Sequence, residues 1–250
     1  MQIKNITNTY YPKLNFGSNI RTVRNADNNI IHRNTTSFFR NDIIWDDLAQ
    51  YIGDFYKDSD KVNIYCFGCS DGSEPYSLAA SIKSNVSRFN KFFPIYASDY
   101  DDVIIESALK GEYRVLDREM CAMDEYTKGK WRSYFERSGY NGLSVKKSFK
   151  DFVRFKTEDI TESADKIQKG PKIILCRNLW PYLSFDKKEK LMAKIKEKSD
   201  DKTLVIIGSF DNQSTKISDA FIQNGFVPVN YTDKKWLHAP SSNVWKKKTP

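Results

Sequence analysis

The sequence lacks any apolar run that approaches the ~20 residues of a membrane-spanning helix. Its first residues, MQIKNITNTYYPK, also lack the apolar core of a signal peptide. These two absences predict a cytoplasmic protein with no membrane insertion. Internal repeats and low-complexity linkers are absent as well. A chain of 250 residues without such breaks is expected to form one main domain with a small appendage rather than two equal domains.

Cysteine and histidine are scarce, with four and two residues respectively. Three of the cysteines lie in strand-like contexts, where an unpaired cysteine is usually a small buried hydrophobe and suits a reducing compartment. Cys66 and Cys69 form a C-x-x-C pair, but no second pair and no histidine cluster accompanies them. We therefore expect no metal site. The two histidines, His32 and His238, are too few for a histidine-rich catalytic site.

Positive charge is in excess, because 40 Lys and Arg residues face 32 Asp and Glu residues, for a net charge of +8. Such a chain attracts acidic partners. The lysines, however, form clusters that are interspersed with acids or lie near the C-terminus, such as 187–198 and 246–248. This distribution favours a solvated surface. An acidic protein surface and a nucleic acid are the two alternatives that the charge leaves open; the family resemblance described below favours the acidic protein over the nucleic acid.

The segment 61–82, KVNIYCFGCSDGSEPYSLAASI, is typical of a strand, a turn and a helix. Its apolar run ends at Gly68, as expected for a strand that is covered on both faces. Gly68 and Gly72 can adopt a positive φ, Ser73 can cap the helix, and Pro75 suits the first helical turn. The free amide groups at such a helix start favour a polar or anionic ligand over a merely tight connection.

A second apolar run, FFPIYASD at 92–99, ends in Asp99 and is followed by the helix-like DDVIIESALKG. An acid that closes the second strand of a mononucleotide-binding half commonly binds the ribose hydroxyls. Two further buried strands are predicted at 172–176 and 203–208. Polar residues at the carboxyl ends of these strands are expected to meet in one ligand crevice.

Four segments, in order along the chain, resemble a known family. They are HRNTTSFFRN, GCSDGSEPYSLA, IYASDYDDVIIESALKGEYR and IILCRNLWPYLSFDKKEKL. Together they resemble the chemotaxis receptor glutamate O-methyltransferases of the CheR type, which depend on S-adenosylmethionine. The resemblance implies an α/β, Rossmann-like class I methyltransferase fold. This fold has a mostly parallel, doubly wound sheet with a terminal antiparallel strand and a small inserted antiparallel β subdomain.

The resemblance also implies, position by position, which residues form the site. The implied cofactor-binding residues are Asn34, Thr36, Arg40, Gly68, Cys69, Glu74, Asp99, Asp159, Ile160, Arg177 and Asn178. Arg40 and Tyr182 are the implied catalytic residues, and S-adenosyl-L-homocysteine is the implied product. The residues alone also allow a surface ion pair of Arg40 with Asp42 or Asp46.

Two regions depart from the family or leave alternatives open. Residues 1–33 show no clear period and are predicted to form an extended arm before a methyltransferase domain at 34–250, whereas family members begin with a helical domain. A small β insertion is expected near 140–156, where the segment LSVKKSFKDFVRFK at 143–156 predicts two short strands around a turn. In the family, the corresponding subdomain resembles a receptor-tail docking surface, and a purely structural hairpin is the alternative.

Shorter elements complete the expected fold. A short helix is predicted to start at Thr36 or Ser37, and an amphipathic helix spans 42–56. A terminal antiparallel pair is predicted from 221–231 and 235–238. The segment 114–137 carries Trp131, Tyr134 and Phe135 at helical spacing, which is typical of core packing.

The implied reaction is methyl transfer to a glutamate carboxylate of a protein, possible substrates including a chemoreceptor. A carboxylate with a pKa of about 4.3 is already ionised at neutral pH, so the absence of a catalytic His or Cys pattern is consistent with this chemistry. Two other functions stay open. One is a methyltransferase of the same fold with a small-molecule or nucleic-acid acceptor, and the other is a cofactor-binding module without turnover.

Overall fold

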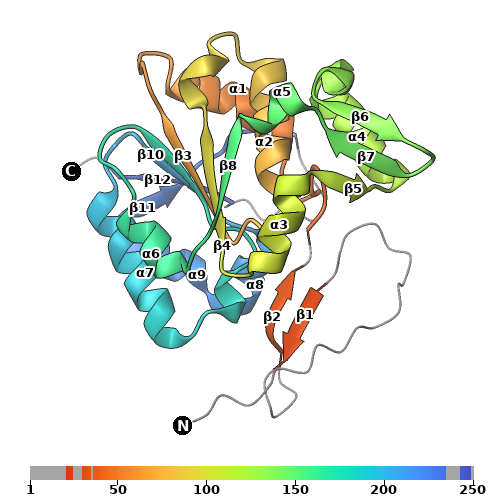
Figure 1. Cartoon of the computed structure of the whole chain (residues 1–250). Helices are drawn as coiled ribbons and strands as arrows, with labels where there is room; N and C mark the ends of the chain where they lie inside the picture. Colours follow the sequence, from red (N-terminus) through yellow and green to blue (C-terminus); the bar gives the residue numbers. More distant parts are fainter. Residues whose placement is uncertain (1–20, 25–29, 35, 235–242, 249–250) are drawn as a thin grey trace.

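A seven-stranded sheet forms the centre of the computed structural model, which describes residues 21–24, 30–34, 36–234 and 243–248 (Figure 1). Its strand order is β11-β12-β10-β9-β3-β4-β8. The strands are β3 (Asn63–Phe67), β4 (Ile95–Asp99), β8 (Val153–Thr157), β9 (Lys172–Leu175), β10 (Thr203–Ile206), β11 (Phe226–Pro228) and β12 (Val244–Lys247). The five strands from β8 to β10 pair in parallel, and β12 pairs antiparallel with both β10 and β11. The expected parallel sheet with a terminal antiparallel strand is confirmed.

Helices cover both faces of the sheet (Figure 1). They are α1 (Trp45–Phe55), α2 (Ser73–Asn85), α3 (Asp102–Lys110), α4 (Asp117–Tyr126), α5 (Lys147–Lys150), α6 (Ile160–Asp165), α7 (Phe185–Lys198), α8 (Ser209–Thr215) and α9 (Ile217–Gln223). Ile64 and Cys66 of β3 pack in one core with α1 and α2, and Tyr65 and Phe67 pack in the other with α6 and α7. This alternation explains why β3 is apolar on both faces.

A separate three-stranded antiparallel sheet has the order β5-β7-β6. Its strands are β5 (Glu112–Arg114), β6 (Phe135–Ser138) and β7 (Gly142–Val145). The predicted hairpin at 143–156 is wrong, because β7 belongs to this small sheet, α5 follows it, and β8 belongs to the central sheet. The inserted β subdomain therefore exists, but it draws its strands from 112–145 rather than from 140–156.

Other local predictions differ from the structure as well. Ser73 is the first residue of α2 rather than its cap, because Gly72 takes the cap position with φ 87° and Ser73 donates its hydroxyl hydrogen bond to Asp71 at 2.6 Å. No helix starts at Thr36 or Ser37, and the residues that follow, Phe38 and Phe39, form a turn. Residues 235–238 lie outside the described residues, and the partner of β11 is β12.

The described part of the predicted arm is a two-stranded antiparallel sheet of β1 (Arg21–Arg24) and β2 (Ile30–Asn34). The division of the chain at residue 33 stays a prediction. None of the helices among the described residues is long and apolar enough to cross a membrane.

Candidate active site

The carboxyl ends of four neighbouring parallel strands form one edge of the central sheet. β3 ends at Phe67 before Gly68, and β4 ends at Asp99. β9 ends at Leu175 before Arg177 and Asn178, and β10 ends at Ile206 before Gly208. Four of the residues predicted for the site, Gly68, Asp99, Arg177 and Asn178, therefore come together, as expected for the ligand edge of an open α/β sheet.

Asp99 is held between the turn after β3 and the start of α3. Its carboxylate accepts hydrogen bonds from the backbone N–H of Ser70 at 3.0 Å and of Asp101 at 3.1 Å. The side chain is buried, with the residue 3% exposed. Gly68 and Ser70 both have positive φ, 64° and 51°, which turns the chain back toward β4. Asp99 thus lies where the sequence predicts, and its contact with ribose hydroxyls stays a prediction.

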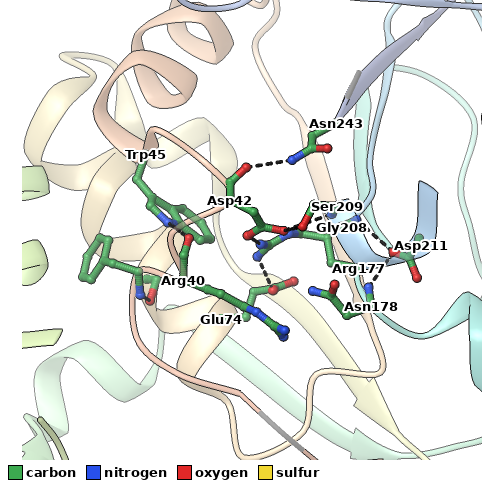
Figure 2. A network of polar contacts seen from close by, with 12 residues as sticks. Arg40, Asp42, Trp45, Glu74, Arg177, Asn178, Gly208, Ser209, Asp211 and Asn243 are labelled. Carbon is green, nitrogen blue, oxygen red and sulfur yellow. Dashed lines mark hydrogen bonds and ion pairs between the residues drawn. The ribbon is translucent and has the colours of Figure 1, made fainter. Parts of the chain in front are cut away.

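Arg177 is the centre of a buried charge network (Figure 2). Its side chain is 0% exposed and forms ion pairs with Asp42, which precedes α1, and with Glu74 of α2. The guanidinium also lies over the Trp45 ring, 5.4 Å from its centroid. A buried cation needs such partners, because transfer from water without them is costly.

Asp42 connects this network to two further segments. Its Oδ2 accepts hydrogen bonds from the Ser209 backbone N–H at 3.1 Å and from the Ser209 hydroxyl at 3.3 Å, and its backbone carbonyl accepts one from Asn243 at 2.7 Å. The carboxylate that the sequence offered as a partner for Arg40 therefore pairs with Arg177. Sequence reasoning missed this role, because the partners lie 135 and 167 residues away along the chain.

Burial and charge oppose each other at both ends of the Arg177–Glu74 pair. Burial raises the pKa of Glu74, while Arg177 and the charge of Arg40 act to lower it. Burial works to lower the pKa of Arg177, but Asp42 and Glu74 outweigh it and raise that pKa. Cys66 lies 3.9 Å from Glu74 Oε1, and burial raises the pKa of its thiol.

The cysteines of the chain are all unpaired, and Cys66, Cys69 and Cys176 are buried as predicted. Burial raises the pKa of the Cys69 thiol well above its usual range. Across the described ranges, no group of three His, Cys, Asp or Glu side chains could hold a metal ion.

Arg40 follows a turn that α2 and α4 hold in place. The Phe38 N–H donates to Glu119 at 3.0 Å, and the Phe39 N–H donates to the Ser77 hydroxyl at 2.9 Å. Phe39 has a φ of 48°, a left-handed conformation that a bulky residue adopts only when its surroundings impose it. The half-buried Arg40 side chain extends beside Glu74 toward Asn178 (Figure 2). This placement brings the predicted Arg40 into the site.

The loop after β9 is held from the other side by Asp211. Its carboxylate accepts the backbone N–H groups of Asn178, Trp180 and Gly208. Burial raises the pKa of Asp211 to about 6, although these three N–H groups and Arg177 act to lower it. Tyr182 is half-buried at the end of the 3-10 turn Trp180–Tyr182, with its ring centroid 6.5 Å from that of Phe210.

The remaining predicted residues are less firmly tied to the network. Asp159 caps α6 by accepting the Thr161 N–H at 2.9 Å, and it forms an ion pair with Lys187 at 2.6 Å. Ile160 packs, partly buried, against the core under α6 and α7. Thr36 is half-buried, and the Asn34 side chain lies outside the described part of the structure. Cofactor contacts of these four residues stay predictions.

The family model and the curated relatives that match this chain all concern the same kind of methyltransferase. The family model for "CheR methyltransferase, SAM binding domain" matches residues 34–226. A chemotaxis protein methyltransferase of Listeria innocua is 31% identical over 167 residues, which cover 66% of this chain and 60% of the relative. A chemotaxis protein methyltransferase of Salmonella typhimurium is 22% identical over 209 residues, which cover 82% of this chain and 70% of the relative. The match thus spans about three fifths of the length of the Listeria relative.

Proposed function

The chain belongs to the CheR methyltransferase family, and on that premise we propose that it transfers a methyl group from S-adenosylmethionine to glutamate carboxylates of a protein. The observation that supports this proposal most directly is the convergence of Arg40, Glu74, Asp99 and Arg177 at one edge of the sheet. These residues come from four segments that the family motifs matched separately.

The residues present fit the cofactor. Asp99 offers a fixed carboxylate at the end of β4, which suits ribose hydroxyls. Glu74 offers a second carboxylate, which suits a protonated amino group. Asn178 Oδ1 is buried and has no hydrogen-bond partner among the described residues, so a ligand donor would satisfy it. Bound S-adenosylmethionine would supply a sulfonium methyl group whose carbon a carboxylate oxygen can attack in line, with S-adenosylhomocysteine as the leaving group.

The protein has to orient and desolvate rather than to move a proton. The glutamate acceptor is ionised at neutral pH, so no general base is needed. Arg40 can bind that carboxylate with a two-pronged fork and so set the line of attack. We place Tyr182 on the opposite side of the transferred methyl, where its ring face would stabilise the sulfonium charge. Correct alignment of reacting groups can supply several kcal/mol toward the barrier, on the order of 7–11 in the best intramolecular cases.

We further propose that the acceptor is an acidic segment of a protein, with a chemoreceptor as the first candidate. The relatives are named chemotaxis protein methyltransferases. The small sheet offers an edge strand, β6, beside a cavity of about 280 Å³. That cavity is lined by Trp131, Arg132, Phe135, Glu136, Arg137 and Lys146. An extended acidic segment could add to this edge and meet the three cations.

The activity test is incubation with methyl-labelled S-adenosylmethionine and chemoreceptor cytoplasmic domains, followed by treatment with base. We expect a base-labile methyl ester on the receptor. Label that resists base, or that appears only on small acids or nucleic acid, would contradict a protein-glutamate acceptor.

Arg40→Lys tests the assigned orienting role. We expect turnover to fall at least tenfold, about 1.4 kcal/mol in the barrier, with a smaller change in cofactor affinity. Arg118→Lys, on the exposed side of α4, is the matched control and should keep full turnover. Full turnover of Arg40→Lys on the true acceptor would show that the fork geometry is not needed.

The docking surface can be tested without removing a strand of the central sheet. Arg132→Glu combined with Arg137→Glu reverses charge beside the cavity. Methylation of the protein acceptor should fall while cofactor affinity stays unchanged. Equal methylation by the variant and the wild type would place the acceptor elsewhere.

A further inference from the structure

The loop that carries the family motif after β9 is only partly held by local hydrogen bonds. The Tyr182 N–H donates to the Leu179 carbonyl and the Trp180 indole N–H donates to the Cys176 carbonyl, both at 3.0 Å. Asn178 has a φ of 56°, in the left-handed region that Asn adopts more readily than most other residues with a side chain. Gly208 approaches the same loop so closely that a Cβ at Gly208 would lie 2.3 Å from Asn178 Oδ1. The backbone N–H groups of Asn178 and Trp180 find their acceptor outside the loop.

Asp211 is this acceptor. The residue is 0% exposed and lies at the third position of α8. Oδ2 accepts the N–H of Asn178 at 2.5 Å and of Gly208 at 2.8 Å, and Oδ1 accepts the N–H of Trp180 at 3.1 Å. Figure 2 shows the Asp211 carboxylate between Gly208 and Asn178. Two of these three donors belong to the loop that starts with Arg177.

We propose that Asp211 is a positioning residue that holds the 177–182 loop in the geometry required for cofactor binding. This inference rests on the proposed function only in that Arg177 and Asn178 face the cofactor. It adds to that function a residue outside the loop, on α8, that determines the conformation of the loop. Asp211 itself acts through the loop backbone.

A carboxylate suits this task because it accepts hydrogen bonds only. An Asn side chain of the same shape offers one acceptor oxygen and an NH₂ group that would face a backbone N–H. The alternative role of Asp211 is to cap α8 through Gly208. A pure cap would affect stability but would leave the loop and the cofactor affinity unchanged, so the two roles can be separated by experiment.

The pH dependence gives a second, independent signature. Burial raises the pKa of Asp211 to about 6, so the loop loses one acceptor as the pH falls through that value. The groups that face Asp211 are Arg177, two residues after the end of β9, and the Cys176 thiol. Asp42 and Glu74 lie beyond Arg177. Titration of the amino and carboxyl groups of S-adenosylhomocysteine contributes equally to the wild type and the variant, so the comparison of the two proteins removes it.

The experiment measures the affinity for S-adenosylhomocysteine by calorimetry at pH 7.5 and pH 5.0. We expect Asp211→Asn to weaken binding at least tenfold at pH 7.5. The wild type should lose affinity at least threefold at pH 5.0, with a ceiling of about tenfold for one group whose pKa is about 6. Glu74, whose pKa is also raised, should cost both proteins the same affinity at pH 5.0. The variant has no titrating carboxyl at position 211 and should therefore lose less affinity than the wild type.

Asp219→Asn, on the exposed side of α9, is the matched control and should bind like the wild type. Asp211→Glu keeps a carboxylate and should bind better than Asp211→Asn, which covers the case in which the Asn variant does not fold. Binding by folded Asp211→Asn within twofold of the wild type at pH 7.5 would overturn the proposal, and so would equal losses of affinity at pH 5.0.

These results are distinguishable from a failure of the proposed function. The readout is cofactor affinity, which needs no methyl acceptor. A wild type that binds S-adenosylhomocysteine but methylates no protein would overturn the acceptor assignment and leave the Asp211 comparison intact. A wild type that does not bind S-adenosylhomocysteine would overturn both.

Discussion

Replacement of Asp42 by Asn removes the charge that faces buried Arg177 and keeps nearly the same side-chain shape. The Arg177 side chain is 0% exposed and that of Asp42 is 10% exposed, so solvent screens their attraction very little. Removal of one partner from a buried pair typically costs about 3–5 kcal/mol, because the remaining charge is left uncompensated. Glu74 stays in contact with Arg177 and limits the loss. We therefore expect the free energy of unfolding to fall by about 2–4 kcal/mol at pH 7.5.

Urea unfolding followed by circular dichroism measures this loss, with the slope m compared between wild type and variant to confirm that the same surface is exposed. Asp165→Asn is the matched control. Asp165 pairs with Lys194, and these side chains are 60% and 39% exposed. Such an exposed pair contributes at most about 1 kcal/mol. The contrast between the two variants isolates the effect of burial on an otherwise similar ion pair.

A loss below about 1 kcal/mol for Asp42→Asn, or one equal to that of the control, would refute the reasoning. A double-mutant cycle with Glu74→Gln sharpens the test. Because both carboxylates serve the same guanidinium, the second substitution would leave Arg177 with neither of its ion-pair partners, and the two effects should not add. Additive losses would show that the two pairs are independent.

The central sheet could be predicted from the sequence because its strands encode their environment locally. The segments 61–67, 92–99, 172–176 and 203–208 are apolar on both faces, and the structure places β3, β4, β9 and β10 within them. A strand that helices cover on both faces exposes neither face to water, so side chains on both faces are apolar. The acid at the end of β4 and the Arg-Asn pair after β9 were predicted from the topology of open α/β sheets together with the family resemblance.

The small sheet could not be predicted in the same way. In the segment 143–156, Val145, Phe149 and Val153 are all buried, as a hairpin would require. Local alternation shows which side chains are buried but not which strand accepts the hydrogen bonds. β7 pairs with β5 and β6, whose residues lie up to about thirty positions earlier, and β8 pairs with β4. Pairing across such separations depends on the assembled fold.

The carboxylates that support the site escaped sequence reasoning for a related reason. Asp42 and Asp211 lie in the polar stretches FRND and SFDN, which are typical of surface turns. Their partners are 135 residues away for Asp42 and 31 to 33 residues away for the loop contacts of Asp211. One local signal did exist, because Asp211 follows Gly208 at the three-residue spacing of a capping box. That spacing indicates a helix start but not the contact with Asn178.

Three further predictions test the site and its surroundings. Asp99→Ala should weaken cofactor binding tenfold or more by calorimetry, while Asp102→Ala, exposed on α3, should not; unchanged affinity would remove Asp99 from the site. Gly72→Ala places a Cβ 2.7 Å from the Phe155 ring at a φ of 87°, whereas Gly139→Ala, at a φ of 64°, meets nothing within 4 Å. Urea unfolding should show the first variant to be less stable than the second by about 1 kcal/mol or more, and equal losses would mean that the Phe155 contact relaxes freely.

The last prediction concerns Asp211 and stability. Burial raises its pKa in the folded protein to about 6, above the usual 3.8. For a raised pKa, the contribution to stability is fully present below the unfolded value and is lost as the pH rises through the folded value. Between pH 5.0 and pH 7.5 the wild type should therefore lose about 1.4 kcal/mol that Asp211→Asn does not lose. The difference in unfolding free energy between the two proteins should shift in favour of the variant as the pH rises, and a difference that stays constant would contradict the raised pKa. Since ionised Asp211 costs stability at the pH where it organises the loop, its charge serves the site rather than the fold.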